Sequence, residues 1–222
     1  MNTARSIKQI PPQDGPRDAE IPLEFLYVDD ALLVVNKPAG LLAVPGRGPD
    51  KQDCLASRVA QCYPGTLVVH RLDMATSGLV LFARSADMQR ALSRMFEMRQ
   101  IEKQYVALVS GTPPANGEIT LPIAPDWPNR PLQKVDLLNG KPALTKFTHL
   151  GSCAHGTRLL LEPVSGRTHQ LRLHLAAIGH PILGDTLYGG APAERLMLHA
   201  TALDFFHPAN GEKLVFQSPA PF

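Results

Sequence analysis

The stretch at residues 68–82 constrains the fold of this chain more than any other. Two apolar runs, typical of strands, flank a polar segment that contains His70, Arg71, Asp73, Thr76 and Ser77. Polar groups between buried strands must find hydrogen-bond partners, because each group left unpaired costs about 1–3 kcal/mol. A chain that accepts this constraint usually has a use for the groups. Asp73 is therefore the first candidate for a reactive residue.

The composition indicates a globular chain with a sizeable core. Its 222 residues are 44% hydrophobic and 19% charged, with a formal net charge of +2. A nearly neutral total does not exclude a basic binding face. The three cysteines include no C-x-x-C pair, which favours a reduced compartment. The apolar runs are far shorter than the roughly 20 residues that cross a membrane, so we expect a soluble, cytoplasmic protein with no membrane partner.

The chain is expected to be a flexible tail followed by one domain. Residues 1–21 are rich in proline and charge and have too few apolar residues to offset their ordering entropy. Residues 22–222 contain no internal repeat and no linker, so we expect a single domain there.

Hydrophobic periodicity predicts many short strands and few helices in that domain. Besides the two runs in the opening stretch, strands are expected near residues 24–28, 31–36, 103–111, 119–123, 143–150, 158–162, 197–206 and 213–217. Helices are expected at residues 53–62 and 86–99 and at residues 171–178, before Gly179. This pattern favours an α+β fold on a mostly antiparallel, mixed sheet with a few flanking helices.

Two groups of basic residues admit more than one interpretation. Arg90 and Arg94 lie one turn apart on the predicted helix at residues 86–99, where a solvated helix face is the ordinary explanation. The only tryptophan, Trp127, lies in a proline-rich segment near Arg130 and Lys134. Its ring could stack on a nucleic-acid base, or it could fill the core.

The motifs of common cofactor sites are absent from the sequence. No histidine pair has a zinc-binding i, i+4 spacing, and neither a glycine-rich phosphate loop nor a G-x-S-x-G elbow occurs. We therefore expect no metal and no cofactor. In extended backbone, Arg71 and Asp73 would point the same way, and a nearby guanidinium favours an ionised, nucleophilic carboxylate. An ordinary Arg–Asp ion pair explains these two residues equally well.

Residues 70–78 (HRLDMATSG) resemble, position for position, the H-R-L-D-x-x-T-S-G signature of the RluA family of pseudouridine synthases. Three further blocks resemble the family in the same order, at residues 36–41 (NKPAGL), 103–107 (KQYVA) and 166–174 (GRTHQLRLH). The resemblance runs from about residue 23 to the C-terminus. Residues 126–131 (DWPNRP) and the chain length resemble the short bacterial members of dual specificity.

The resemblance implies a reaction and the residues that perform it. The chain would isomerise uridines to pseudouridine in structured RNA, in 23S ribosomal RNA and in a tRNA anticodon stem-loop, without a cofactor. The resemblance does not fix the oligomeric state, for which a monomer is the default expectation. Asp73 corresponds to the nucleophile, Tyr105 to the tyrosine that stacks on the target uracil, and Arg172 to the arginine that pairs with the aspartate. The histidine and hydroxyl residues of the signature would shape its loop by hydrogen bonding.

The resemblance also implies where RNA is held. Many family members carry an N-terminal S4-type RNA-binding domain, and none is expected here. The catalytic domain would then bind RNA itself, with Arg71 in the space left by the flipped nucleotide or beside it. The basic residues expected to contact RNA are Arg71, Arg84, Arg90, Arg94, Arg130, Lys134 and Arg167.

Two other functions were weighed against this one. A non-catalytic RNA-binding factor would not need to retain Asp73, Tyr105 and Arg172 together. A glycoside hydrolase would need a second acid beside Asp73, and only Glu102 stands at the matched blocks.

Overall fold

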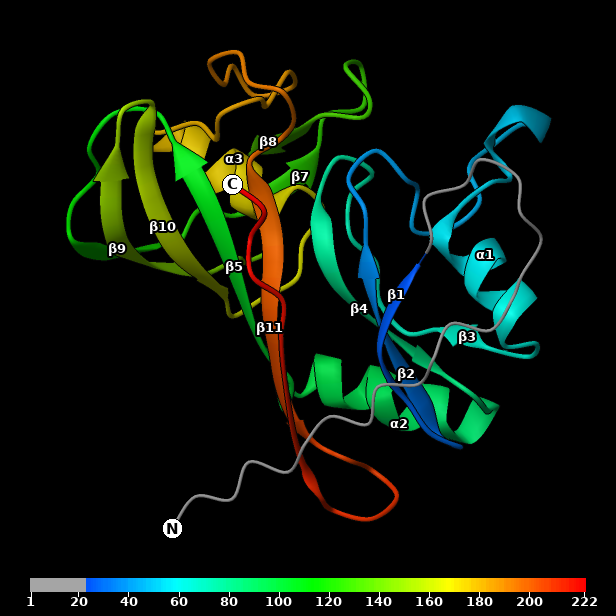
Figure 1. The fold of residues 1–222 in the computed structure, drawn as a ribbon. Coiled ribbons are helices and arrows are strands. Elements are labelled where there is room, and N and C mark those ends of the chain that lie inside the picture. Colours follow the sequence, from blue (N-terminus) through cyan, green and yellow to red (C-terminus); the bar gives the residue numbers. More distant parts are fainter. Residues whose placement is uncertain (1–22) are drawn as a thin grey trace, which may run out of the picture. The chain divides into compact units, whose positions relative to one another are not determined.

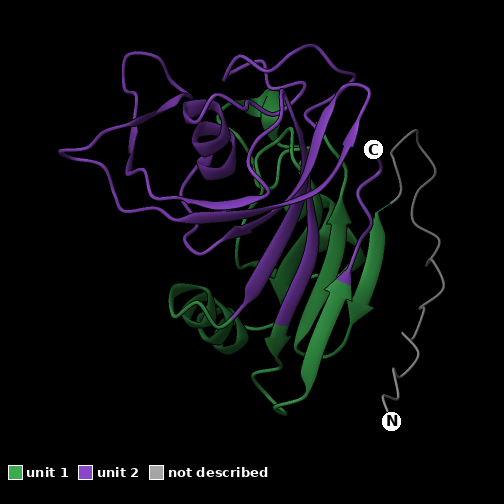
Figure 2. Ribbon diagram, turned by 90° about the vertical axis from the view of Figure 1, so that its left-hand side faces the viewer, with its two compact units in different colours: residues 1–100, 205–216 green, residues 101–204, 217–222 purple. Residues whose placement is uncertain are grey.

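The computed structural model describes residues 23–222, so the predicted tail at residues 1–21 lies outside the described residues. The described chain divides into two compact units (Figure 2). Unit 1 contains residues 23–100 and 205–216, and unit 2 contains residues 101–204 and 217–222. That residues 22–222 form a single domain stays a prediction.

Unit 1 is built on an antiparallel sheet with two α-helices (Figure 1). Its strands are β1 (Glu24–Val28), β2 (Leu32–Lys37), β3 (Leu67–Val68), β4 (Ser77–Ala83) and most of β12 (Lys213–Gln217). Its helices are the short 3-10 helix η1 (Pro49–Lys51), α1 (Leu55–Cys62) and α2 (Ala86–Glu97). β2 pairs with β1 and with β4, and β3 also pairs with β4.

β4 is the buried strand around which unit 1 is organised. All seven of its residues are buried, which explains the continuous apolar run in the sequence. α2 packs against β3 and β4, and its Leu92 is fully buried. Ser85 caps this helix, because its hydroxyl accepts a hydrogen bond from the Met88 amide at 3.2 Å.

Unit 2 contains a second set of antiparallel strands and one α-helix. The elements are β5 (Glu102–Val109), β6 (Asn116–Ile119), β7 (Ile123–Pro125), β8 (Gln133–Val135), β9 (Thr145–Cys153), β10 (Gly156–Pro163), α3 (Gln170–Ala177) and β11 (Leu198–Phe206), the last of which ends in unit 1. The strand order is β11-β5-β10-β9-β6, whereas β7 and β8 form a separate hairpin.

The predicted α+β class with mostly antiparallel strands is confirmed, although several elements differ from the prediction. The strand predicted at residues 119–123 is wrong, because Ile119 ends β6 and Ile123 begins β7 of the separate hairpin. α2 ends before residue 99, since Arg99 has a left-handed φ of 60°. β8 was missed, because three residues are too few to show a period.

Within residues 23–222, no helix is both long enough and apolar enough to cross a membrane.

A carboxylate network joins separate segments of unit 1. Asp29 accepts hydrogen bonds from the amides of Ala31 and Leu32 at 2.7 and 2.8 Å and from the Tyr27 hydroxyl at 2.8 Å. His207 Nε2 lies 3.0 Å from its Oδ2. Burial alone would raise the pKa of Asp29, but these hydrogen bonds together with the charge of His207 lower it below its ordinary value.

We expect Asp29→Asn to lower the free energy of unfolding by about 1–3 kcal/mol at pH 7, because the amide loses the charge-assisted bonds. A carboxyl whose folded pKa is lowered stabilises the protein above its unfolded pKa, and that stability is lost as the pH falls through the folded pKa. The difference in the free energy of unfolding between wild type and variant should therefore become smaller below about pH 4. Urea unfolding at pH 7 and pH 3 measures this difference, with the exposed Asp30→Asn as control. A difference that does not depend on pH would contradict the expectation.

Candidate functional site

Asp73 lies on the loop between β3 and β4. The Thr76 amide donates to the Asp73 carbonyl at 3.1 Å, which closes a tight turn directly after the aspartate. The Asp73 side chain is half-buried, and Thr76 and Ser77 behind it are buried. The turn therefore fixes the backbone of the candidate nucleophile at the entrance to β4.

A buried lysine forms a hydrogen bond to this turn. The Lys37 side chain is fully buried at the end of β2, and its Nζ donates to the carbonyls of Pro38, Leu41 and Met74 at 2.9, 2.7 and 3.0 Å. The Gly40 amide also donates to the Met74 carbonyl, at 2.9 Å. A buried ammonium is costly unless hydrogen bonds compensate it, so this lysine clamps the Asp73 loop to the end of β2.

His70 fixes the other side of the loop. Its Nε2 accepts a hydrogen bond from the Leu81 amide at 2.9 Å, and its ring packs 4.5 Å from the ring of Phe96 on α2. Because an accepting Nε2 carries no proton, the imidazole acts here as a neutral anchor. This agrees with the expectation that His70 shapes the loop.

Arg71 differs from its neighbours in the loop. Its side chain is exposed and forms no hydrogen bond or ion pair with any of residues 23–222. The plain Arg71–Asp73 ion pair that the sequence left open is therefore not present. Arg71 is available for an external ligand.

Arg172 lies in unit 2 and is held by a second buried network. Its Nε and Nη2 donate to Oδ2 and Oδ1 of Asp185 at 2.8 and 2.7 Å, with Arg172 5% and Asp185 1% exposed. The amides of Leu187 and Tyr188 also donate to Asp185 Oδ1, at 3.0 and 3.2 Å. The orientation of the guanidinium is thus fixed by a carboxylate that is itself fixed.

Tyr188 connects this network to the β7–β8 hairpin. Its ring centroid lies 5.4 Å from Cζ of Arg172. Its hydroxyl accepts from the Gln133 amide of β8 at 2.9 Å and lies 2.9 Å from Nδ1 of His169, just before α3. The hairpin, the helix start and the arginine are therefore parts of one polar cluster within unit 2.

Tyr105 lies near the middle of β5 in unit 2. Its partners across the strands are Leu161 on β10 and Ala200 on β11, and its side chain is half-buried. Tyr105 and Arg172 belong to unit 2, whereas Asp73 belongs to unit 1. The pairing of Asp73 with Arg172 stays a prediction.

His174 is a structural residue. It is fully buried on α3, with Nδ1 3.0 Å from the Thr145 hydroxyl and Nε2 2.8 Å from the Leu121 carbonyl. Burial lowers the pKa of this imidazole, which favours its neutral form.

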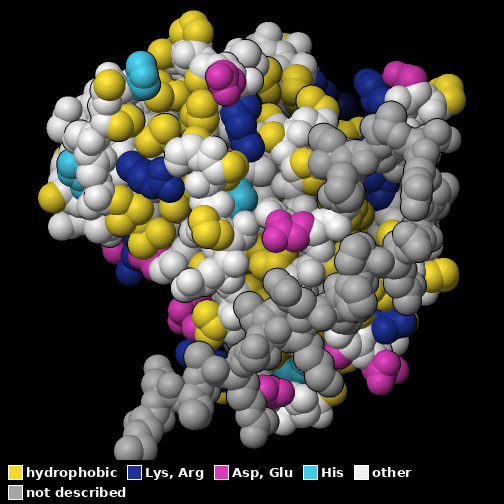
Figure 3. Space-filling view, viewed as in Figure 1, with side chains coloured by type: hydrophobic (Ala, Val, Ile, Leu, Met, Phe, Trp, Pro, Cys, Tyr) yellow, Lys and Arg dark blue, Asp and Glu magenta, His cyan; other side chains and the backbone are white. Residues whose placement is uncertain are grey.

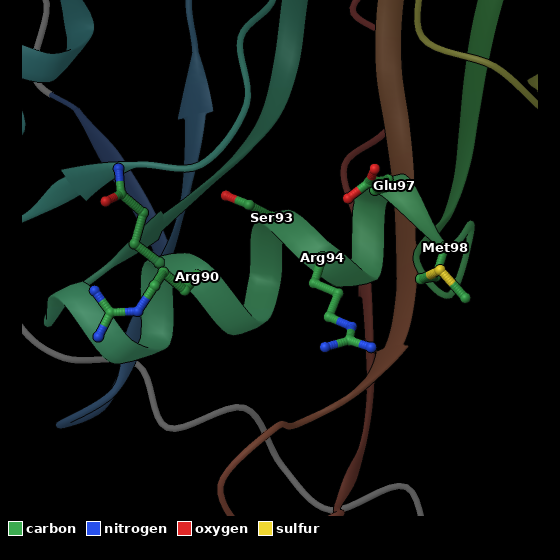
Figure 4. A pocket seen from close by; sticks show the side chains of 6 residues that line it. Arg90, Ser93, Arg94, Glu97 and Met98 are labelled. Atoms are coloured by element: carbon green, nitrogen blue, oxygen red, sulfur yellow. The ribbon is translucent and has the colours of Figure 1, made fainter.

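The basic residues predicted on unit 1 differ in how far they are engaged. Arg84 donates to the Asp29 carbonyl at 2.8 Å and lies over the Tyr63 ring, so it has a structural role. Arg90 forms an exposed ion pair with Asp87 on the same helix. Arg94 is exposed one turn further along, and both arginines line a shallow depression of about 500 Å³ along α2 (Figure 4).

The basic residues predicted on unit 2 are exposed. Arg167 Nε donates to the Pro142 carbonyl at 3.1 Å, and Lys134 lies 3.6 Å from Asp136. Arg130 stacks on Trp127, with its Cζ 3.6 Å from the ring centroid. Trp127 is 65% exposed, so it does not fill the core. On the face shown in Figure 3, basic side chains are scattered among acidic and hydrophobic ones.

Lys37 and Asp185 are the residues that sequence reasoning missed. Lys37 lies in the matched block at residues 36–41, where it drew no attention as a single charge. Asp185 follows Gly184, which has a φ of +75° and where a Cβ would lie 1.9 Å from the Arg195 carbonyl oxygen. A glycine of this kind beside an acidic residue is the signal that could have marked the turn.

Comparisons with known proteins agree on one family. A family model described as RNA pseudouridylate synthase matches residues 31–177. The dual-specificity RNA pseudouridine synthase RluA of Escherichia coli K12 is 49% identical over 206 residues, which cover 90% of this chain and 94% of the relative. The protein of the same name from Haemophilus influenzae is 46% identical over the same shares.

Two solved human structures resemble the fold. RNA pseudouridylate synthase domain containing 1 is 30% identical, with a TM-score of 0.73 over 94% of this chain and 87% of its own. RNA pseudouridylate synthase domain containing 4 is 26% identical, with a TM-score of 0.72 over 89% of this chain and 88% of its own. The family match includes the positions of Asp73, Tyr105 and Arg172.

We expect Lys37→Met to lower the free energy of unfolding by about 2–4 kcal/mol, because it leaves the carbonyls of the half-buried Pro38 and Leu41 without this donor. The exposed Lys51→Met, also in unit 1, should change it by less than about 0.5 kcal/mol. Urea unfolding followed by circular dichroism measures both. Equal stabilities of the two variants would show that the lysine does not hold the loop.

Proposed function

This chain belongs to the RNA pseudouridylate synthase family, and on that premise we propose a dual specificity for it, toward one uridine in 23S ribosomal RNA and one in a tRNA anticodon stem-loop. The enzyme is an isomerase that turns an N-glycosidic uridine into its C-glycosidic isomer. The dual specificity is supported by the relatives of that name, which are matched over nearly their whole length. We further propose that it acts as a monomer in the cytoplasm.

Asp73 is assigned the nucleophilic role. The observation that carries this assignment is the family signature at residues 70–78 on a loop whose backbone is held by Lys37 and His70. Fixing a reacting group before the substrate arrives removes part of the entropic cost of the reaction. The isomerisation involves no net oxidation and no net hydrolysis, and the proposed residues need no cofactor for it.

Tyr105 and Arg172 are assigned the roles of their family counterparts. The Tyr105 ring supplies a platform for the target uracil, and Arg172 pairs with the Asp73 carboxylate. Asp185 holds the Nε–Nη2 edge of the guanidinium. A guanidinium has five N–H donors in a fixed fork and can hold two carboxylates in this way.

RNA is proposed to be held mainly through phosphate contacts. A target base must leave its stack before it reacts, at a cost of a few kcal/mol. Arg71, which is exposed in the same loop as Asp73, is proposed to contact the RNA around the flipped nucleotide. Arg90, Arg94 and Arg167 are proposed as phosphate contacts, whereas Arg84 is the weakest candidate because of its bond to Asp29.

We expect Asp73→Asn to abolish pseudouridine formation, because an amide is not a nucleophile of this kind. The dissociation constant for RNA should stay within about three-fold of wild type. Purified protein is incubated with 23S rRNA and tRNA transcripts, pseudouridine is scored by carbodiimide mapping, and RNA binding is measured by filter retention. Activity retained in the variant would refute the assignment, and RNA binding without product in the wild type would favour a non-catalytic factor.

We expect Asp185→Asn to lower kcat by about ten- to a hundred-fold, because the guanidinium loses the charged partner that orients it. KM should change little, since Asp185 is buried and does not reach the RNA. The matched control is the exposed Glu194→Gln, nearby in the chain. Single-turnover kinetics and thermal unfolding are measured together, and a kcat that falls only in proportion to the unfolded fraction would reduce Asp185 to a structural residue.

A further inference from the structure

The loop between β7 and β8 presents an aromatic ring to solvent. Trp127 is 65% exposed although the guanidinium of Arg130 lies 3.6 Å above its ring. An exposed indole costs hydrophobic free energy, and tryptophan is enriched among the residues that dominate the binding energy of interfaces. The catalytic roles assigned above do not use this pair.

Main-chain hydrogen bonds hold the loop in one shape. The Asp126 amide donates to the Leu132 carbonyl at 3.0 Å, and the Leu132 amide donates to the Asn129 carbonyl at 3.0 Å. The Asn129 side-chain amide donates to Asp126 Oδ2 at 2.9 Å. Pro128 restricts the backbone directly after the tryptophan. The ring is therefore positioned before any ligand binds, which lowers the entropic cost of binding.

The base of the hairpin rests on the helix that carries Arg172. Ile123 and Val135 of the two strands pack with Leu173 of α3 and with Tyr188. β7 and β8 lie beside α3 in Figure 1. Pro125 pairs with Gln133, whose amide donates to the Tyr188 hydroxyl, so Trp127 follows that link to the Arg172 cluster by two residues.

The chemistry of the pair suits a nucleotide. The indole face can stack on any base, and such stacking is largely independent of sequence. A guanidinium that stacks through its face keeps its in-plane N–H donors directed sideways, where they can bind phosphate oxygens. Lys134, exposed on β8, adds a second positive charge on the same hairpin.

We propose that Trp127 and Arg130 form a stacking platform for one unpaired base of the substrate RNA loop, a base other than the target uridine. This inference rests on the proposed function, because it takes the Arg172 cluster to be part of the active site. The base stacks on Trp127, and Arg130 contacts its phosphate. The hairpin then reads the shape of the RNA loop near the target, so that only loops that can splay out a base at this place are modified.

Trp127 is the only tryptophan of the chain, so its fluorescence reports on the platform directly. The full-length Asp73→Asn protein is titrated with a tRNA anticodon stem-loop transcript and with a 23S rRNA hairpin transcript. We expect the emission to be quenched by each substrate, with a midpoint equal to the dissociation constant from filter retention. RNA binding with unchanged emission would refute the proposal that Trp127 stacks on a base. Absence of pseudouridine after incubation with the wild-type protein would instead refute the proposed function.

Variants separate stacking from charge. Trp127→Ala should weaken binding of the stem-loop about ten-fold or more, as expected for the loss of one base–aromatic stack, with an unchanged salt dependence. Trp127→Phe should restore most of the affinity. Arg130→Ala should reduce the slope of log affinity against log salt by about one. The control is Phe206→Ala, which removes an aromatic ring that is 59% exposed on β11.

An abasic scan of the RNA loop identifies the stacked base. At one position other than the target, removal of the base should weaken binding to the wild type and leave the affinity of Trp127→Ala unchanged, because both changes remove the same contact. If every abasic RNA remained as sensitive to Trp127→Ala as the intact RNA, the proposal would be refuted. Normal binding by Trp127→Ala, with native thermal unfolding, would refute it as well.

Discussion

A buried ammonium group is the interaction on which the loop of the candidate nucleophile depends. The loop leaves β3, turns at Asp73 and enters β4, and its own turn at Thr76 and its His70 side chain hold only part of it. Lys37 supplies three hydrogen bonds from a fully buried position, and one of them reaches the carbonyl directly after Asp73. A flexible loop at this point would have to be ordered again at every turnover, so rigidity here serves the reaction.

The same principle recurs around Arg172 with the opposite charges. There a buried carboxylate, Asp185, fixes a guanidinium, and two backbone amides fix the carboxylate. Breaking such a buried pair leaves an unpaired charge and is costly. Tyr188 links this network to the β7–β8 hairpin through its bond to Gln133. The hairpin that carries the proposed RNA platform and Arg172 therefore both contact Tyr188.

Much of the fold could be predicted from the hydrophobic pattern of the sequence. The hydrogen bonds and ion pairs of the candidate site could not. The strand β4 and the helix α2 were recognisable because burial leaves an apolar run or an apolar period in the sequence. The hairpin of β7 and β8 was not, since its strands have three residues each. Asp73 was found from its unusual setting and the family signature. Lys37 and Asp185 were missed because their partners are carbonyls and an arginine that are fixed only by the tertiary structure. The exposure of Trp127 and the lack of an Arg71–Asp73 pair likewise needed the structure, because side-chain environment cannot be read from spacing alone.

The Lys37 clamp also bears on how sequences of this kind can diverge. The oxygens at Pro38, Leu41 and Met74 belong to the main chain, and every amino acid carries one. Replacement of any of these three side chains leaves the acceptor in place, provided that the backbone keeps its path. The lysine has no such freedom. We expect position 37 to be lysine throughout related sequences, whereas the side chains at positions 41 and 74 vary. A conserved charge beside variable side chains would then be the mark of a contact between a side chain and the main chain.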